Sequence, residues 1–231
     1  MAISKINDSA SSQEPQLNGQ EAFFLKFRKQ IIIAVAVVVA AIACYICYTT
    51  FLDTPRQEKA STALAKAQEA FAQGDFQKAL NGDKAQQGFL AVSEDFGGTD
   101  AANLARLYAG LCYANLGKWQ EAVKYLDDFS TKDDAMISPA ATAALGNALA
   151  HTGDIDKAIS TLKKAAKMAD SEAEEGVNNS LSPTFLIQAA RLLESQNKQD
   201  EALAIYKEIK EKYVNSAAAA DIDKYIERAT K

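Results

Sequence analysis

Residues 117–122 read Gly-Lys-Trp-Gln-Glu-Ala, and the pattern of this stretch occurs four times along the chain. In each copy an alanine stands five residues after a glycine or asparagine and twelve residues after another small residue. Glycine and asparagine take the left-handed conformation that ends a helix, and small residues let two helices approach closely. The spacing therefore predicts four pairs of packed helices. The small residue, turn residue and alanine of the four copies are Ala67, Gly74 and Ala79; Gly110, Gly117 and Ala122; Gly146, Gly153 and Ala158; and Ala190, Asn197 and Ala202.

An apolar stripe follows the turn in the second helix of a pair. In the second copy, apolar residues recur at helical spacing at Trp119, Ala122, Val123, Leu126 and Phe129. Four copies of a small residue, a turn residue and an alanine at fixed offsets are the pattern of tetratricopeptide repeats. The sequence thus predicts an all-α fold, a solenoid of about four tetratricopeptide helix pairs, with Trp119 in its core.

Two insertions interrupt this array. Successive alanines of the pattern are 43, 36 and 44 residues apart, whereas a standard repeat has about 34 residues. Residues 81–100 are expected to form an extra helix that shapes the concave face, packed through Phe89, Leu90, Val92 and Phe96. Residues 170–183 are acidic and rich in turn residues, which predicts a solvated loop.

The end of the chain predicts one more helix. Residues 216–229 place Ile222, Tyr225 and Ile226 on one face and charged residues on the other. A stack of helix pairs needs a polar-backed cap at its open end. This segment is therefore the predicted capping helix.

Residues 31–52 read IIIAVAVVVAAIACYICYTTFL, without a charged residue between Lys29 and Asp53. A helix crosses a bilayer core with roughly 20 apolar residues. A signal peptide has a shorter apolar core and a small-residue cleavage site, whereas this run ends in bulky residues. It predicts a single retained membrane anchor that contacts the lipid bilayer. The residues expected to anchor it are Ile31, Ile32, Ile33, Val35, Val37, Val38, Val39, Ile42 and Ile46.

Charges beside the anchor predict its orientation. Lys26, Arg28 and Lys29 precede it, while Asp53 and Arg56 follow it, and basic residues near a membrane favour the cytoplasmic side. We therefore expect three regions: a disordered cytoplasmic tail at 1–22, rich in Ser, Asn and Gln; an anchor helix at 23–52; and the solenoid at 53–231, outside the cytoplasm.

Composition argues against nucleic-acid binding and catalysis. Residues 53–231 carry 21 basic and 27 acidic residues, and an acidic domain binds nucleic acid poorly. Cys44 and Cys47 lie within the apolar run, where thiolates form with difficulty, so small apolar filler is a better interpretation than a redox or metal site. The single histidine, His151, is expected at the surface. We predict no enzyme activity, cofactor, metal or small-molecule substrate.

Stacked helix pairs form a groove that binds proteins, and helical phase suggests first-helix residues Arg106, Tyr113, Asn147 and Gln188 as its lining. Three binding roles are open. The alternatives are an adaptor outside the cytoplasm, a cytosol-facing receptor that grips terminal carboxylates, and a structural tether or scaffold in another envelope-assembly complex. The receptor needs cations on successive first helices, and residues 139–150 contain none.

Several short motifs point to a family. They are the apolar anchor followed by Pro55-Arg56-Gln57-Glu58-Lys59-Ala60, then Ala79-Leu80-Asn81-Gly82-Asp83, Gly88-Phe89-Leu90, Ala102-Asn103-Leu104-Ala105, Tyr108-Ala109-Gly110 and Asp221-Ile222-Asp223-Lys224-Tyr225-Ile226-Glu227. In this order they resemble a bacterial family of N-terminally anchored tetratricopeptide proteins, relatives of the YfgM-type ancillary subunit of the Sec translocon. The resemblance implies a single-pass inner-membrane protein with periplasmic repeats. It also implies Sec translocon subunits and a periplasmic chaperone or foldase as partners.

Overall fold

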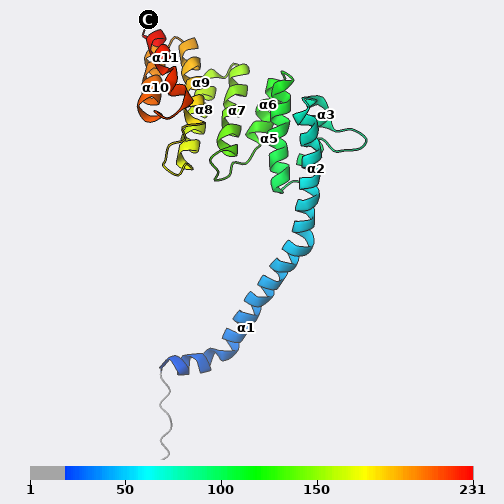
Figure 1. Cartoon of the computed structure of the whole chain (residues 1–231). Coiled ribbons are helices and arrows are strands. Elements are labelled where there is room, and N and C mark those ends of the chain that lie inside the picture. Colours follow the sequence, from blue (N-terminus) through cyan, green and yellow to red (C-terminus); the bar gives the residue numbers. More distant parts are fainter. Residues whose placement is uncertain (1–18, 231) are drawn as a thin grey trace, which may run out of the picture. The chain divides into compact units, whose positions relative to one another are not determined.

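The computed structural model describes residues 19–230, and helices are the only extended regular elements in that range (Figure 1). The all-α prediction is confirmed. Most of the tail expected at 1–22 lies outside the described residues, but the first helix already begins at Gly19, inside that range.

The N-terminal helix is apolar over most of its length. Helix α1 (Gly19–Tyr48) continues through a π-helical turn, η1 (Thr49–Asp53), into α2 (Thr54–Ala72). In the turn, the Thr54 hydroxyl donates to the Thr49 carbonyl at 2.9 Å. The described residues contain one helix long and apolar enough to cross a membrane, and its most apolar window is not buried by the rest of the chain. Of the predicted anchor residues, Ile31 is partly buried and the others are more than half exposed.

The chain divides by its internal contacts into two units, Met1–Thr54 and Pro55–Lys231. The boundary falls two residues beyond the predicted end of the anchor at residue 52.

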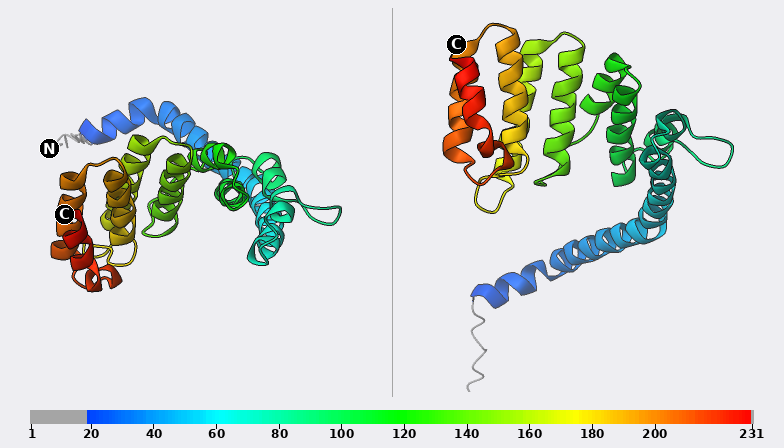
Figure 2. Two further views of the ribbon diagram at one scale, coloured as in Figure 1. Left: turned by 90° about the horizontal axis from the view of Figure 1, so that it is seen from above. Right: turned by 45° about the horizontal axis from the view of Figure 1, so that its top comes forward.

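The second unit is a stack of antiparallel helices, in which each helix packs on the next along the chain (Figure 2). Its helices form four consecutive groups and a cap. The groups are α2 with α3 (Phe76–Asn81) and α4 (Phe89–Asp95); α5 (Asp100–Asn115) with α6 (Trp119–Asp127); α7 (Ile137–His151) with α8 (Ile155–Ser171); and α9 (Ser182–Ser195) with α10 (Gln199–Lys212). The cap consists of a 3₁₀ turn, η2 (Ala217–Ala220), and α11 (Ile222–Ala229).

The same backbone turn joins the two helices of every pair. Gly74, Gly117, Gly153 and Asn197 all have positive φ, from 59° to 90°. After each of them the next N–H donates to the carbonyl five residues earlier, at 2.9–3.0 Å. This bond pattern ends a helix and reverses the chain. The turn within each pair therefore depends only on residues that are close in the sequence.

Close contact between the helices of a pair depends on the small residues. A Cβ added at Gly110 would lie 2.6 Å from Cγ of Leu126, and one at Gly146 would lie 2.8 Å from Cγ of Leu162. Each leucine stands four residues after the alanine of its repeat. The alanines are fully buried, but the nearest side chain to each glycine belongs to the leucine one turn later.

The first insertion forms the predicted extra helix. Loop 82–88 is closed by a β-bridge between Gly82 and Gln87, and α4 follows it. Phe89 and Val92 of α4 are fully buried in one core cluster with residues of α2, α3 and α5. Leu90 and Phe96 pack against the same cluster, so α4 contributes to the core of the first group through all four predicted residues.

The second insertion and the cap are corrected. Asp170 is a buried residue of α8, and the loop is confined to residues 172–181. The expected helix over 216–229 is a 3₁₀ turn followed by the shorter α11, because the Ser216 hydroxyl accepts a hydrogen bond from Ala219 N and begins the turn. Ile222 is buried, as the predicted inner face requires.

Candidate functional site

The four predicted groove residues are all half-buried. Arg106 and Asn147 make no side-chain hydrogen bond or ion pair within the described part of the chain. Tyr113 stacks on Tyr125 of α6, with ring centroids 5.3 Å apart, and burial raises its pKa. Gln188 has a buried Oε1 atom without a hydrogen-bond partner. None of the four lines the cavities described below, so the structure does not gather them into one pocket.

The tryptophan and the histidine of the repeats form a contact that the sequence did not indicate. Trp119 is only partly buried, and it packs against the core cluster of α5, α6 and α7 from its edge rather than lying inside it. Its ring lies parallel to that of His151, with centroids 3.7 Å apart. His151 is exposed, as predicted. The stack joins the start of α6 to the end of α7, because the two antiparallel helices bring these ends together.

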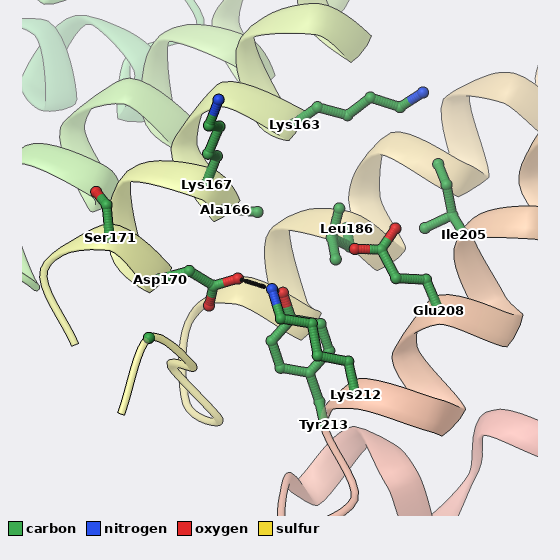
Figure 3. A pocket seen from close by; sticks show the side chains of 11 residues that line it. Lys163, Ala166, Lys167, Asp170, Ser171, Leu186, Ile205, Glu208, Lys212 and Tyr213 are labelled. Carbon is green, nitrogen blue, oxygen red and sulfur yellow. Dashed lines mark hydrogen bonds and ion pairs between the residues drawn. The ribbon is translucent and has the colours of Figure 1, made fainter. Parts of the chain in front are cut away.

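A cavity of about 510 Å³ opens between α8, α9 and α10 (Figure 3). Ala166, Leu186 and Ile205 form its apolar floor and are each at most 5% exposed. Lys163 and Lys167 of α8 stand at its rim, as Figure 3 shows. The cavity therefore combines an apolar base with positive charge at its edge.

Asp170 closes one end of this cavity. Its Oδ1 atom accepts from Asn178 N at 2.8 Å and from the Ser182 hydroxyl at 2.7 Å. Its Oδ2 atom accepts from Lys212 Nζ at 2.5 Å and from the Tyr213 hydroxyl at 2.6 Å. One carboxylate thus joins α8, the loop 172–181, the start of α9 and the end of α10.

The electrostatics of this network follow from its contacts. Burial by itself would raise the pKa of Asp170, but the hydrogen bonds from Asn178, Lys212, Ser182 and Tyr213 outweigh it and lower that pKa. The bond to Asp170 raises the pKa of Lys212. Burial, with the carboxylate beside it, raises the pKa of Tyr213 to about 12. Asp170 and Lys212 are therefore both charged at neutral pH.

Sequence reasoning missed Asp170 because it stands at the edge of an acidic, turn-rich segment. A signal was nevertheless present: Asp170 follows Ala166 by four residues and Leu162 by eight, on the buried stripe of α8. A charged residue in that phase needs partners from other elements.

The described residues show little that could support chemistry. They contain no group of three or more His, Cys, Asp or Glu side chains placed to hold a metal ion. Burial raises the pKa of Cys112 to about 12, so this thiol stays protonated at neutral pH.

Stacked helix pairs with repeated left-handed turns define a tetratricopeptide solenoid. Comparison with protein families agrees: residues 21–173 match the tetratricopeptide repeat-like domain, and residues 186–216 match the tetratricopeptide repeat. The first match covers more than half of the chain, which therefore belongs to the tetratricopeptide repeat-like domain family. A comparison with curated proteins finds no match. Repeats of this kind present extended surfaces for binding other proteins.

Proposed function

We propose that the protein is a membrane-anchored adaptor of the bacterial inner membrane, with its repeat domain in the periplasm. There it would bind Sec translocon subunits or a periplasmic chaperone or foldase. The observation that carries the proposal is one apolar, uncovered helix placed directly before a stack of tetratricopeptide helix pairs. The anchor would hold the stack at the membrane, and the stack would bind the partner.

Two features support the orientation and the mode of binding. Lys26, Arg28 and Lys29 precede the apolar run, which favours a cytoplasmic N-terminus. On the first helices, Arg106 and Asn147 keep their donors free of partners among the described residues, so these donors are available to a bound protein.

The topology test uses single cysteines. Cys44 and Cys47 are replaced by alanine, while Cys112 stays because it is buried and unreactive. Ser160, an exposed residue of α8, or Ser11 in the tail is then changed to cysteine. A membrane-impermeant maleimide should label Ser160→Cys in intact spheroplasts and Ser11→Cys only after lysis. The opposite pattern would place the repeats in the cytoplasm and support the receptor alternative.

The partner test uses a photo-crosslinking residue at Arg106 or Asn147 in native membranes. Translocon subunits or a periplasmic foldase should be recovered from both positions, whereas the same residue at exposed Lys84 in the loop 82–88 serves as the control. Recovery of outer-membrane assembly factors alone would reject the translocon assignment and favour a scaffold in another envelope complex.

A further inference from the structure

Helix α8 exposes an unusual group of lysines. Lys157, Lys163, Lys164 and Lys167 are all exposed, and no ammonium group among them makes a hydrogen bond or ion pair with the described residues. At 3.6 residues per turn they share about a third of the helix circumference. The buried residues of α8, such as Leu162, occupy the opposite side.

The fold does not account for these charges. Both aspartates of α8 are used by other elements: Asp156 lies 3.2 Å from Lys198 Nζ, and Asp170 lies 2.5 Å from Lys212 Nζ. Lysines in the last turn of a helix stabilise it by interacting with the helix dipole, but the last turn of α8 contains no basic residue. Like charges one turn apart, as in Lys163 and Lys167, repel each other. The group therefore weakens the helix slightly and stands out in an acidic domain.

A cleft lies on each side of the lysines. Lys163 and Lys167 border the cavity of Figure 3, which also contains Glu208. Lys157 and Lys164 border a second cleft of about 310 Å³ between α6, α7 and α8. The second cleft has apolar side chains and one carboxylate in its wall, namely Leu126, Phe129, Leu145 and Asp127. Together the two clefts have five lysines and three carboxylates, and because Lys212 and Asp170 pair with each other, four lysines and two carboxylates remain.

We propose that the two clefts and the lysines between them, here called the α8 surface, dock an acidic segment of a partner protein. Its Asp or Glu side chains would meet the lysines, and apolar side chains between them would settle on the cleft floors. The inference rests on the proposed adaptor function and names the chemistry of one partner. The four lysines of the α8 surface belong to the second helix of a pair, whereas Arg106 and Asn147 belong to first helices.

A protein segment fits the α8 surface better than an anionic membrane does. The apolar floors lie in depressions, which side chains can enter and a flat lipid surface cannot reach. In addition, Glu172, Glu174 and Glu175 are exposed just beyond α8 and would be repelled by acidic head groups.

The test uses the full chain in nanodiscs of zwitterionic phosphatidylcholine. The probe is a fluorescein-labelled peptide of 14 residues in which pairs of glutamates alternate with single leucines. Its binding is followed by fluorescence anisotropy. The triple variant Lys163→Gln, Lys164→Gln and Lys167→Gln should bind at least tenfold more weakly than the wild type. The peptide with glutamine in place of glutamate should not bind.

A matched control separates a site from overall charge. Lys84, Lys118 and Lys207 are exposed and without ion partners among the described residues, so changing them to glutamine alters the net charge equally. This control should bind within threefold of the wild type. Circular dichroism checks folding, and neutral glutamine relieves the repulsion on α8, so loss of binding does not reflect unfolding.

Two results with the peptide would overturn the proposal: equally weakened peptide binding in both triple variants, or no peptide binding to the wild type. A third would be that the wild-type protein binds added vesicles of anionic phosphatidylglycerol and does not bind the peptide. The adaptor function is judged separately. If photo-crosslinks from Arg106 persist in membranes while the peptide fails to bind, the adaptor stands and the α8 surface does not. If those crosslinks are also absent, the adaptor proposal fails as well.

Discussion

Replacing Asp170 by asparagine should destabilise the repeat domain by about 2 kcal/mol at neutral pH. The amide keeps one oxygen for Asn178 N and the Ser182 hydroxyl, which bind Oδ1 in the native protein. Its NH₂ group, however, would face the donors of Lys212 and Tyr213. The substitution thus removes an ion pair without opening a cavity.

The magnitude follows from the exposure of the two partners. Hydrogen bonds to charged groups contribute roughly 1.5–3 kcal/mol. The Asp170 side chain is 11% exposed, so its interactions are poorly screened, but Lys212 is 39% exposed and can return to water. The loss of stability expected for Asp170→Asn therefore lies in the lower part of that range. Asp170→Ala also abandons the Oδ1 contacts and should cost about 3–5 kcal/mol, as for other broken buried pairs.

The effect should depend on pH with a definite sign. Because the folded protein lowers the pKa of Asp170, the carboxylate contributes its full stabilisation above its unfolded-state pKa of about 3.9 and loses it as the pH falls through the lower folded-state value. The difference between wild type and Asp170→Asn should therefore shrink below about pH 4.

The assay is urea unfolding of the full chain in detergent micelles, followed by circular dichroism at 222 nm between pH 3 and 7. The control is Asp156→Asn, because Asp156 also pairs with a lysine but is 78% exposed. It should cost less than about 1 kcal/mol. The reasoning about Asp170 is refuted if Asp170→Asn unfolds like the control at pH 7, or if its deficit is unchanged at low pH.

The other predictions concern the repeat geometry and the anchor. Gly146→Leu should cost about 2 kcal/mol or more in the same unfolding assay, because even its Cβ would lie 2.8 Å from Leu162 Cγ; a stability equal to wild type would show that the helices can separate freely. Asn197→Gly should be neutral within about 0.5 kcal/mol, whereas Asn197→Val should cost about 1–2 kcal/mol because φ is 59° there; equal effects of the two changes would exclude backbone strain. Cys47→Ala should leave membrane insertion and folding unchanged, measured by carbonate extraction and protease resistance; loss of function at normal expression would instead indicate a redox or metal role.

The helix pairs could be predicted because their signals are local. A glycine or asparagine at the turn, as at Gly153 or Asn197, needs only a few neighbouring residues to reverse the chain. The apolar run at 31–52 is equally local, since length and composition alone make it long and apolar enough for a membrane. The start of the helix is less well predicted, because it begins at Gly19 and the anchor was expected from residue 23.

Contacts between distant segments could not be predicted from one segment alone. Trp119 has the phase of a core residue and packs at the edge of the core, but its stack on His151, 32 positions further along, was not indicated by the sequence. The apolar segment containing Phe89 was correctly expected to be helical, but its partners on α2 and α5 decide that it fills a core. Periodicity shows which face of a helix is apolar and does not show which helix will cover it.

The sequence by itself determined the helical class, the four helix pairs with their left-handed turns, and one helix apolar enough for a membrane, because each depends on residues within one or two turns of one another. Tertiary structure alone decided which charged side chains of α8 are paired. Asp170 meets Lys212 across 42 positions, so only packing reveals that the carboxylates of α8 are paired and that Lys163 and Lys167 have no partner among the described residues. The physical reason is that the state of a charge depends on which groups lie within a few ångströms, and in a folded stack those groups come from other helices.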